Sequence, residues 1–261
     1  MKIPIYHVDA FTSEVFSGNP AAVCVLDHWI SDSTLQAVAF ENNLPETAFV
    51  AQNGDVFDLR WFTPVTEVAL CGHGTLATAY VLFERQNWAK KTICFQTRKS
   101  GQLVVEKKDD LLEMDFPSRP PGGKKTVKGL AKMLGATPIE VLGSEEDMFV
   151  VLGSEQDVKD LKPDLDALAT LDCRGVIVTA RGEKVDFVSR FFAPAVGIPE
   201  DPVTGSAHCV LVPYWASVLK KKNLHALQVS RRGGELFCED RGKRVGIAGR
   251  AALYLEGAIS I

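Results

Sequence analysis

Two stretches of the chain are apolar on every face that a helix would present. The first covers residues 75–86 and the second roughly residues 207–219. A helix that is hydrophobic all round is usually buried on all sides. Strand-like patterns flank both stretches, so the sequence predicts strands around one buried helix, and it predicts this unit twice. A curled sheet encloses such a helix better than an open parallel sheet does, which indicates the α+β class.

Short apolar runs bounded by turn residues predict the strands. In the first half these runs cover residues 3–10, 21–26, 47–51, 56–62, 92–97, 103–106 and 111–116. A helix capped by Ser31 or Ser33 is expected to end near Asn43. In the second half, helices are expected near 127–134 and within 155–171, and strands at 176–179, at 185–192 and from about 220 to 261. The proline- and glycine-rich segment 117–125 is the clearest linker.

The two halves also share residues at a steady spacing. Arg60, Phe62 and Pro64 recur 130 positions later as Arg190, Phe192 and Pro194. After an insertion of three residues, Glu67, Gly72, Gly101 and Leu103 recur 133 positions later as Glu200, Gly205, Gly234 and Leu236. Identities at fixed spacing suggest a duplicated domain. Because a glycine-containing turn opens the apolar helix in each copy, we expect two helix N-termini to face one another and bind an anionic small molecule.

The bulk composition excludes several classes of protein. The chain of 261 residues suffices for one large domain or two of ordinary size, and 46% hydrophobic residues suffice for a core. The net charge of −4 and the pI near 5.8 argue against a nucleic-acid surface. No apolar run approaches the roughly 20 residues of a membrane helix, and the N-terminus enters a strand pattern without a signal peptide. We therefore expect a cytoplasmic protein with reduced thiols and no nucleic-acid or membrane partner.

Several common chemical signatures are absent from the sequence. The six cysteines show no CxxC pair, and there is no HExxH motif or carboxylate-rich loop, so no metal site is expected. The Gly72-His-Gly74 segment continues Thr-Leu-Ala and lacks the third glycine of a dinucleotide fingerprint. A phosphate-binding Walker loop and a GxSxG elbow are also missing. Nicotinamide, ATP and serine-hydrolase functions therefore lose their main support, and no cofactor is expected.

The turns that open the two apolar helices are the strongest candidates for a binding site. The first turn contains Cys71, Gly72, His73 and Gly74, and the second contains Asp201, Thr204, Gly205 and Ser206. Glycine permits positive φ and close approach of a ligand, and the exposed N–H groups of a helix start attract anions. The alternative is two well-capped helix starts without a ligand. Two related turns, one with a histidine and the other with an aspartate, favour a site.

Two further side chains have the chemistry for proton transfer. Glu46 follows Pro45 and precedes an apolar strand, so partial burial would raise its pKa toward the range of a general acid or base. The alternative for Glu46 is a solvated surface group. Cys71 stands at a helix N-terminus, which is expected to lower its pKa, although a buried and inert thiol is the commoner situation.

These residues lie in segments that resemble the PhzF (phenazine-biosynthesis-like) family, within the diaminopimelate-epimerase-like fold. The resemblance spans nearly the whole chain. Its segments begin with Asp9-Ala-Phe-Thr, Gly18-Asn-Pro-Ala-Ala-Val and Asn43-Leu-Pro-Glu-Thr-Ala-Phe, and continue with Arg60-Trp-Phe-Thr-Pro, Leu70-Cys-Gly-His-Gly-Thr-Leu-Ala-Thr-Ala, Phe192-Ala-Pro and Glu200-Asp-Pro-Val-Thr-Gly-Ser-Ala-His.

The resemblance implies a fold and a reaction. The fold would have two pseudo-symmetric domains with a cleft between them, residues 1–116 completed by strands near 249–261, and residues 117–248. The reaction would be a cofactor-free isomerisation of a biosynthetic kind, in which Glu46 moves a proton between carbons. His73 and Asp201 would bind substrate or assist protonation. The residues implied to bind substrate are Asn19, Gly72, Gly74, Thr204, Gly205 and Ser206, and the backbone amides around Gly72–Gly74 and Gly205–Ser206 would hold its carboxylate. A homodimer is the assembly that fits the family.

The chain departs from this pattern at two positions. Related epimerases use two cysteines, one from each turn, but here Thr204 stands opposite Cys71 in the second copy. Pro45 replaces the serine that phenazine enzymes place beside the glutamate, which makes the phenazine precursor a poor candidate substrate. We therefore expect an isomerase of a small carboxylate-bearing metabolite with Glu46 as general acid and base. The alternatives are a catalytically weak metabolite-binding or regulatory protein and a lyase or dehydratase.

Overall fold

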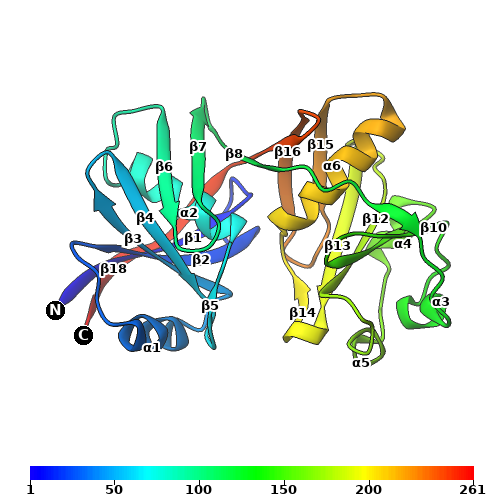
Figure 1. Cartoon of the computed structure of the whole chain (residues 1–261), viewed down its shortest axis with the longest axis horizontal. Coiled ribbons are helices and arrows are strands. Elements are labelled where there is room, and N and C mark those ends of the chain that lie inside the picture. Colours follow the sequence, from blue (N-terminus) through cyan, green and yellow to red (C-terminus); the bar gives the residue numbers. More distant parts are fainter. The chain divides into compact units, whose positions relative to one another are not determined.

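The computed structural model describes residues 1–261, and the chain divides into two compact units. Unit 1 contains Met1–Asp115 and Ala248–Ile261, and unit 2 contains Phe116–Ile247. The expected division, after residue 116, differs from this one by a single position. Each unit combines strands with one long apolar helix, α2 (Gly72–Glu84) in unit 1 and α6 (Gly205–Leu219) in unit 2 (Figure 1). The mixed, strand-rich architecture agrees with the predicted class.

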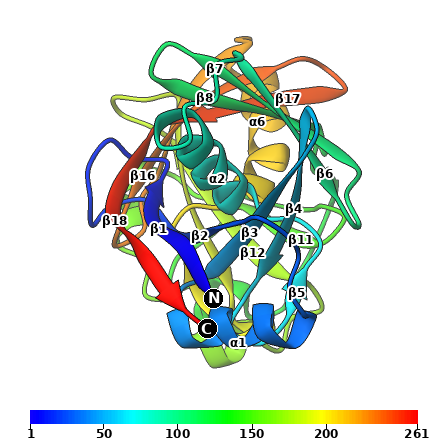
Figure 2. The same ribbon diagram turned by 90° about the vertical axis from the view of Figure 1, so that its left-hand side faces the viewer.

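The elements of unit 1 come from the N-terminal part of the chain and from its last strand. They are β1 (Lys2–Ala10), β2 (Asn19–Leu26), α1 (Asp32–Asn42), β3 (Glu46–Asn53), β4 (Val56–Phe62), β5 (Glu67–Val68), α2, β6 (Thr92–Thr97), β7 (Gln102–Lys108), β8 (Leu111–Pro117) and the C-terminal β18 (Ala251–Ser260). The strand β18 pairs antiparallel with β1 from Lys2↔Ser260 to Ala10↔Ala251. Both chain ends therefore lie side by side in one unit (Figure 2).

Unit 2 contains more short elements than the sequence predicted. They are β9 (Gly122–Lys124), α3 (Leu130–Leu134), β10 (Glu140–Gly143), β11 (Asp147–Val151), α4 (Glu155–Lys159), α5 (Leu165–Leu168), β12 (Gly175–Arg181), β13 (Phe187–Ala193), the 3-10 turn Pro194–Val196, β14 (Ile198–Asp201), α6, β15 (Asn223–Gln228), β16 (Gly234–Asp240) and β17 (Arg244–Gly249). The predicted linker includes β9, which pairs with β10.

The strand pairings of the two units repeat one pattern. In unit 1, β1 to β7 alternate antiparallel and parallel: β1–β2 antiparallel, β2–β3 parallel, β3–β4 antiparallel, β4–β6 parallel and β6–β7 antiparallel. In unit 2 the same alternation links β10, β11, β12, β13, β15 and β16. The short strands β5 and β14 occupy equivalent places beside β4 and β13. The topology thus carries the duplication that the spaced identities indicated.

The helix α2 is buried because it has no polar face. Ten of its residues are buried, from His73 through Phe83, and it contacts β1, β2 and β3. Figure 2 shows α2 among the strands of unit 1. The second helix of this unit, α1, places Leu35, Val38 and Ala39 in a separate apolar cluster with residues of β1, β2 and β3. The sheet of unit 1 is therefore packed on two faces, and α2 is the more deeply enclosed helix.

The helix α6 contains Pro213, which the apolar pattern conceals. A proline inside a helix cannot donate to the carbonyl four residues earlier. In unit 2 that carbonyl, the one of Cys209, accepts a hydrogen bond of 2.9 Å from the N–H of Arg119 instead. The helix continues to Leu219 because a neighbouring segment satisfies the orphaned acceptor.

Each unit also contains the same buried ion pair. Arg60 donates to both carboxylate oxygens of Glu67, at 2.8 and 2.9 Å, and Arg190 does the same to Glu200, at 2.6 and 3.0 Å. Each guanidinium packs over the phenylalanine two residues further on, 5.0 and 4.8 Å from the ring centre. The arginine and the glutamate that recur in both copies therefore form a structural clamp, which ties β4 to β5 and β13 to β14.

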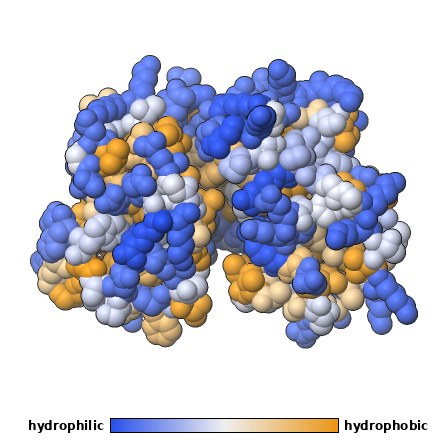
Figure 3. Space-filling view, viewed as in Figure 1, coloured by the Kyte–Doolittle hydropathy of each residue, from blue (hydrophilic) through white to orange (hydrophobic).

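The side of the surface shown in Figure 3 has no continuous apolar face. On the side shown in Figure 3, hydrophobic residues are interspersed with hydrophilic ones on both units. None of the helices has the length and apolar character needed to cross a bilayer.

The clamp in unit 1 allows a test of stability. We expect Arg60→Ala to reduce the free energy of unfolding of unit 1 by about 3 kcal/mol, because the partly buried carboxylate of Glu67 keeps only its longer contact of 3.6 Å with Arg98. Urea unfolding followed by tryptophan fluorescence measures this, since Trp29, Trp61 and Trp88 lie in unit 1. The exposed pair of Lys90 and Asp55 supplies the control, and Lys90→Ala is expected to leave the unfolding curve unchanged. An unchanged curve for Arg60→Ala would contradict the clamp.

Candidate active site

Glu46 and His73 meet where β3 and α2 begin. The Oε2 atom of Glu46 lies 2.9 Å from Nε2 of His73, and the two side chains are 14% and 7% exposed. Glu46 is the first residue of β3, and His73 is the second residue of α2. Unit 1 therefore brings two residues that the sequence analysis named for proton transfer into direct contact, in a place that is nearly dry.

The side chain of Asn19 holds the other nitrogen of the same imidazole ring. Its Nδ2 lies 3.2 Å from Nδ1 of His73, and the residue is fully buried at the start of β2. The amide can donate to a neutral ring nitrogen through Nδ2, and after rotation its oxygen can accept from the N–H of an imidazolium. Asn19, expected to contact substrate, thus lies against His73 and suits both protonation states of the ring.

Burial and the neighbouring side chains shift the pKa of His73 in opposite directions. Burial by itself lowers the pKa of His73, but its interactions with Cys71 and Glu46 raise the pKa well above its ordinary value. The histidine is therefore held as a charged partner for the Glu46 carboxylate. A carboxylate fixed by an imidazolium keeps one defined orientation.

Cys71 is the N-cap of α2. Its Sγ accepts a hydrogen bond of 3.2 Å from the N–H of Gly74 and lies 3.6 Å from Nδ1 of His73. Burial raises the pKa of this thiol and the charge of Glu46 raises it further, while His73 and the Gly74 amide act in the opposite direction. The expected lowering by the helix N-terminus is therefore wrong, because desolvation outweighs the helix start.

Gly74 acts through its small size. Glycine permits positive φ, but none of Gly72, Gly74 and Gly205 has a positive φ, and all three lie within α2 and α6. At Gly74 an added Cβ would lie 2.9 Å from Cδ1 of Trp61 and 3.0 Å from Sγ of Cys71. Gly74 is therefore required because the indole ring and the thiol pack against its Cα.

The turn in unit 2 is held by hydrogen bonds of its own. The hydroxyl of Thr204 donates to Oδ2 of Asp201 at 2.6 Å. Gln228 accepts from the N–H of Thr204 at 2.9 Å and donates to the Asp201 carbonyl at 2.8 Å. Sequence reasoning missed Gln228, although a glutamine ending the apolar strand β15 was a signal that could have been used. Asp201 and Thr204 are thus brought together.

A cation at the start of α6 was also missed. Arg174 donates to both oxygens of Asp147, at 2.9 and 2.5 Å, and to the hydroxyl of Ser206 at 3.2 Å. No sequence motif marks Arg174, because it reaches Ser206 only through the fold. The start of α6 therefore lies beside a guanidinium whose charge the Asp147 carboxylate balances within unit 2.

His208, one turn into α6, is a structural residue. Its Nδ1 donates to the carbonyl of Thr204 at 2.8 Å, and the ring is completely buried. Burial lowers the pKa of His208 to about 4. The ring is neutral at physiological pH and fastens the first turn of the helix.

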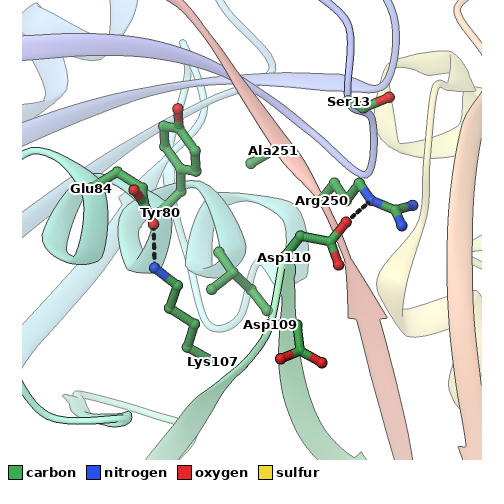
Figure 4. A pocket seen from close by; sticks show the side chains of 9 residues that line it. Ser13, Tyr80, Glu84, Lys107, Asp109, Asp110, Arg250 and Ala251 are labelled. Atoms are coloured by element: carbon green, nitrogen blue, oxygen red, sulfur yellow. Dashed lines mark hydrogen bonds and ion pairs between the residues drawn. The ribbon is translucent and has the colours of Figure 1, made fainter.

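A cavity of about 290 Å³ lies elsewhere in unit 1 and contains none of the candidate residues. Two ion pairs stand in its wall, Lys107 with Glu84 and Arg250 with Asp110 (Figure 4). Because the charges of each ion pair balance one another, neither pair is as good a candidate for proton transfer as the Glu46–His73 contact. Cys71, His73 and Glu46 are, in contrast, a group whose ligand atoms all lie within 4.8 Å of one another, close enough to hold a metal ion.

Comparison with known proteins defines the class of this fold. The structure of a hydroxyproline epimerase from Agrobacterium vitis matches 99% of the chain and 92% of its own length with a TM-score of 0.65, at 9% identity, which is a likeness of fold alone. A PhzF-family protein of Enterococcus faecalis matches over 100% of both chains, with a TM-score of 0.98 and 47% identity. The fold is thus that of the epimerase-like proteins.

Sequence relatives narrow the class to a family. The profile described as phenazine biosynthesis-like protein matches residues 8–257. An uncharacterized isomerase of Pseudomonas aeruginosa is 52% identical over 261 residues, and phenazine biosynthesis-like domain-containing protein 1 of Mus musculus is 42% identical over 288 aligned positions, both with 100% of each chain covered. The chain belongs to the PhzF, or phenazine biosynthesis-like, family. These relatives support an isomerase-like enzyme.

The buried histidine of α6 makes stability depend on pH. Because the folded pKa of His208 is lowered to about 4 from 6.5, only the unfolded chain takes up this proton as the pH falls below 6.5. The contribution of His208 is complete above pH 6.5 and is lost toward pH 4, by roughly 3 kcal/mol. Urea unfolding at pH 7 and pH 4 should show a larger loss for the wild type than for His208→Asn. Equal losses in the two proteins would contradict this assignment.

Proposed function

We propose that the protein is a cofactor-independent isomerase that moves a proton between carbons of a small carboxylate-bearing metabolite, with Glu46 as general acid and base. The 2.9 Å contact between Glu46 and His73 carries this proposal. It leaves one carboxylate oxygen, Oε1, without a partner in the chain, on a side chain that is still 14% exposed. A base needs this combination of a fixed orientation and one accessible oxygen.

The proposed reaction uses a single base. Oε1 of Glu46 takes a proton from a carbon beside an electron-withdrawing group, and the double bond shifts. The protonated Glu46, whose side chain is 14% exposed, exchanges its proton with solvent and then delivers a proton to another carbon. His73 keeps the Glu46 carboxylate in one orientation throughout, and Asn19 keeps the ring in place. A geometry that is set before the substrate arrives lowers the barrier, because no reorientation is needed during the reaction.

The helix start of α2 supplies a place for the substrate carboxylate. The N–H of Gly74 is donated to Cys71, whereas the N–H groups of Gly72 and His73 have no acceptor within the chain. Such groups at a helix N-terminus attract anions. In unit 2, the amides of Gly205 and Ser206 beside Arg174 are a second proposed position for an anionic group, with Asp201 and Thr204 as its polar neighbours.

A two-thiol epimerisation fits these residues less well. The raised pKa of Cys71 disfavours the thiolate that would have to accept a proton. At the equivalent place in unit 2, Thr204 is a hydroxyl that already donates to Asp201. Neither residue has the properties of the base that the two-cysteine reaction needs, so the one-base reaction is the better supported.

Exchange with solvent tests the role of Glu46. In heavy water, the wild type should incorporate one deuterium into its substrate, and Glu46→Gln should lower this rate on the order of 100-fold or more, since general acid–base groups contribute about that much. Mass spectrometry of a carboxylic-acid metabolite collection identifies the labelled compound. Isomerisation conserves the mass of the product apart from the label, whereas dehydration would remove a water.

The matched control is Glu41→Gln, a change at an exposed glutamate of α1. It should exchange at the wild-type rate, and circular dichroism should show that both variants are folded. Undiminished exchange in Glu46→Gln would remove Glu46 from the reaction. Binding of a metabolite without any exchange in the wild type would favour a binding protein instead.

A further inference from the structure

We propose that the side chains of Glu46, Cys71 and His73 together form a binding site for a thiophilic divalent cation such as Zn²⁺, and that the bound cation blocks the site. The binding half of this inference stands on geometry alone, while the inhibitory half rests on the proposed function of Glu46. In residues 1–261 this is the one group of three or more His, Cys, Asp or Glu side chains whose ligand atoms all lie within 4.8 Å of one another.

The three donor atoms are those that zinc takes in proteins. They are a cysteine sulfur, an imidazole nitrogen and a carboxylate oxygen. Sγ of Cys71 lies 3.9 Å from Nε2 of His73, which lies 2.9 Å from Oε2 of Glu46. A tetrahedral ion with ordinary bond lengths would separate sulfur from nitrogen by roughly 3.6 Å and nitrogen from oxygen by roughly 3.4 Å. These two separations would therefore change by up to about half an ångström. Sγ of Cys71 and the Glu46 carboxylate oxygen, which lie within 4.8 Å of one another, would have to approach to roughly 3.6 Å, so the largest adjustment is about one ångström, within the reach of side-chain rotation.

The ligands are held in place by the fold before any ion binds. Cys71 and His73 are separated by one residue at the start of α2, and Glu46 opens β3. Cys71 is 6% exposed and His73 is 5% exposed, so most of their water has already been removed. The cation gains three desolvated donors without ordering a loop. The exposed pair of His225 and Glu235, 2.8 Å apart, has no cysteine and no such enclosure.

Neighbouring groups suit the metal-bound form of these ligands. When Nε2 of His73 binds a metal, Nδ1 carries the proton and needs an acceptor, which metal sites usually supply from a second group. The amide of Asn19, 3.2 Å from Nδ1, provides an oxygen for this after rotation. The N–H of Gly74, which donates to Sγ of Cys71 at 3.2 Å, stabilises a thiolate ligand.

The geometry also explains why the cation would inhibit. Three protein ligands leave one coordination position open for water or a substrate carboxylate. The partial exposure of the Glu46 side chain provides the path for the ion. Once its carboxylate is coordinated, Glu46 can no longer take a proton from carbon. Metal binding and proton transfer therefore exclude one another.

Metal binding to the full-length protein tests the first half. After treatment with a chelator, the wild type should bind one Zn²⁺ per chain in equilibrium dialysis, and Co²⁺ should give a near-ultraviolet thiolate-to-metal band. Cys71→Ser should bind at least about 100-fold more weakly and lose the band, since it removes a direct ligand. Asn19→Ala should weaken binding by roughly 10- to 100-fold, the usual effect of a group that orients a ligand. His225→Ala, the matched control, should bind like the wild type.

Three results would overturn the site. They are a wild type that binds Zn²⁺ no more tightly than Cys71→Ser, a Co²⁺ spectrum of the wild type without a thiolate band, and a loss of binding in His225→Ala. The wild-type spectrum decides the matter even where a variant does not fold. Deuterium exchange then tests inhibition, which should be complete at one equivalent of Zn²⁺ and be reversed by chelator. Absent metal binding would leave the isomerase proposal untouched, and absent exchange with intact metal binding would refute the isomerase proposal alone.

Discussion

The enclosure of a helix that has no polar face is the constraint on which the rest of this structure depends. A helix such as α2 loses stability wherever its apolar side chains meet water, so strands must surround it. Ten of its residues are buried, and β1, β2 and β3 contact it. The same requirement recurs at α6 and accounts for the repeated strand order. The polar groups at the start of each helix, and those that open the neighbouring strands, are then available for chemistry.

This enclosure also determines the chemistry at the start of α2. Burial raises the pKa of Cys71 and by itself lowers the pKa of His73, yet the interactions with Cys71 and Glu46 raise the pKa of the histidine above its ordinary value. The amide of Asn19 lies against the other ring nitrogen of His73, so the ring has a partner at both nitrogens. The same lack of water makes Glu46 a well-oriented base and makes the three donor atoms a ready set of metal ligands.

The two copies of the duplicated unit share their strand order and their Arg–Glu clamp, but the residues at their helix starts differ chemically. In the Arg60–Glu67 clamp and in the Arg190–Glu200 clamp, the arginine donates to both carboxylate oxygens of the glutamate. The helix starts, however, differ. Cys71, whose thiol accepts from the N–H of Gly74, corresponds to Thr204, whose hydroxyl donates to Asp201. The structural clamps tolerate little change because a buried charge needs its partner. The helix starts could diverge because the unpaired N–H groups of a helix N-terminus can donate to many kinds of acceptor.

The sequence by itself determined the class, the duplication and most strands, because apolar periodicity reports burial directly. It also placed Glu46, His73 and Cys71 among the candidates. It could not predict β9 or β14, which are too short for a period, nor the continuation of α6 past Pro213, which depends on a hydrogen bond from Arg119. Only the tertiary structure decided that Asn19 lies on His73, that Gln228 and Arg174 support the second turn, and that the pKa of Cys71 is raised. Those contacts join residues far apart in the chain, and no local pattern records them.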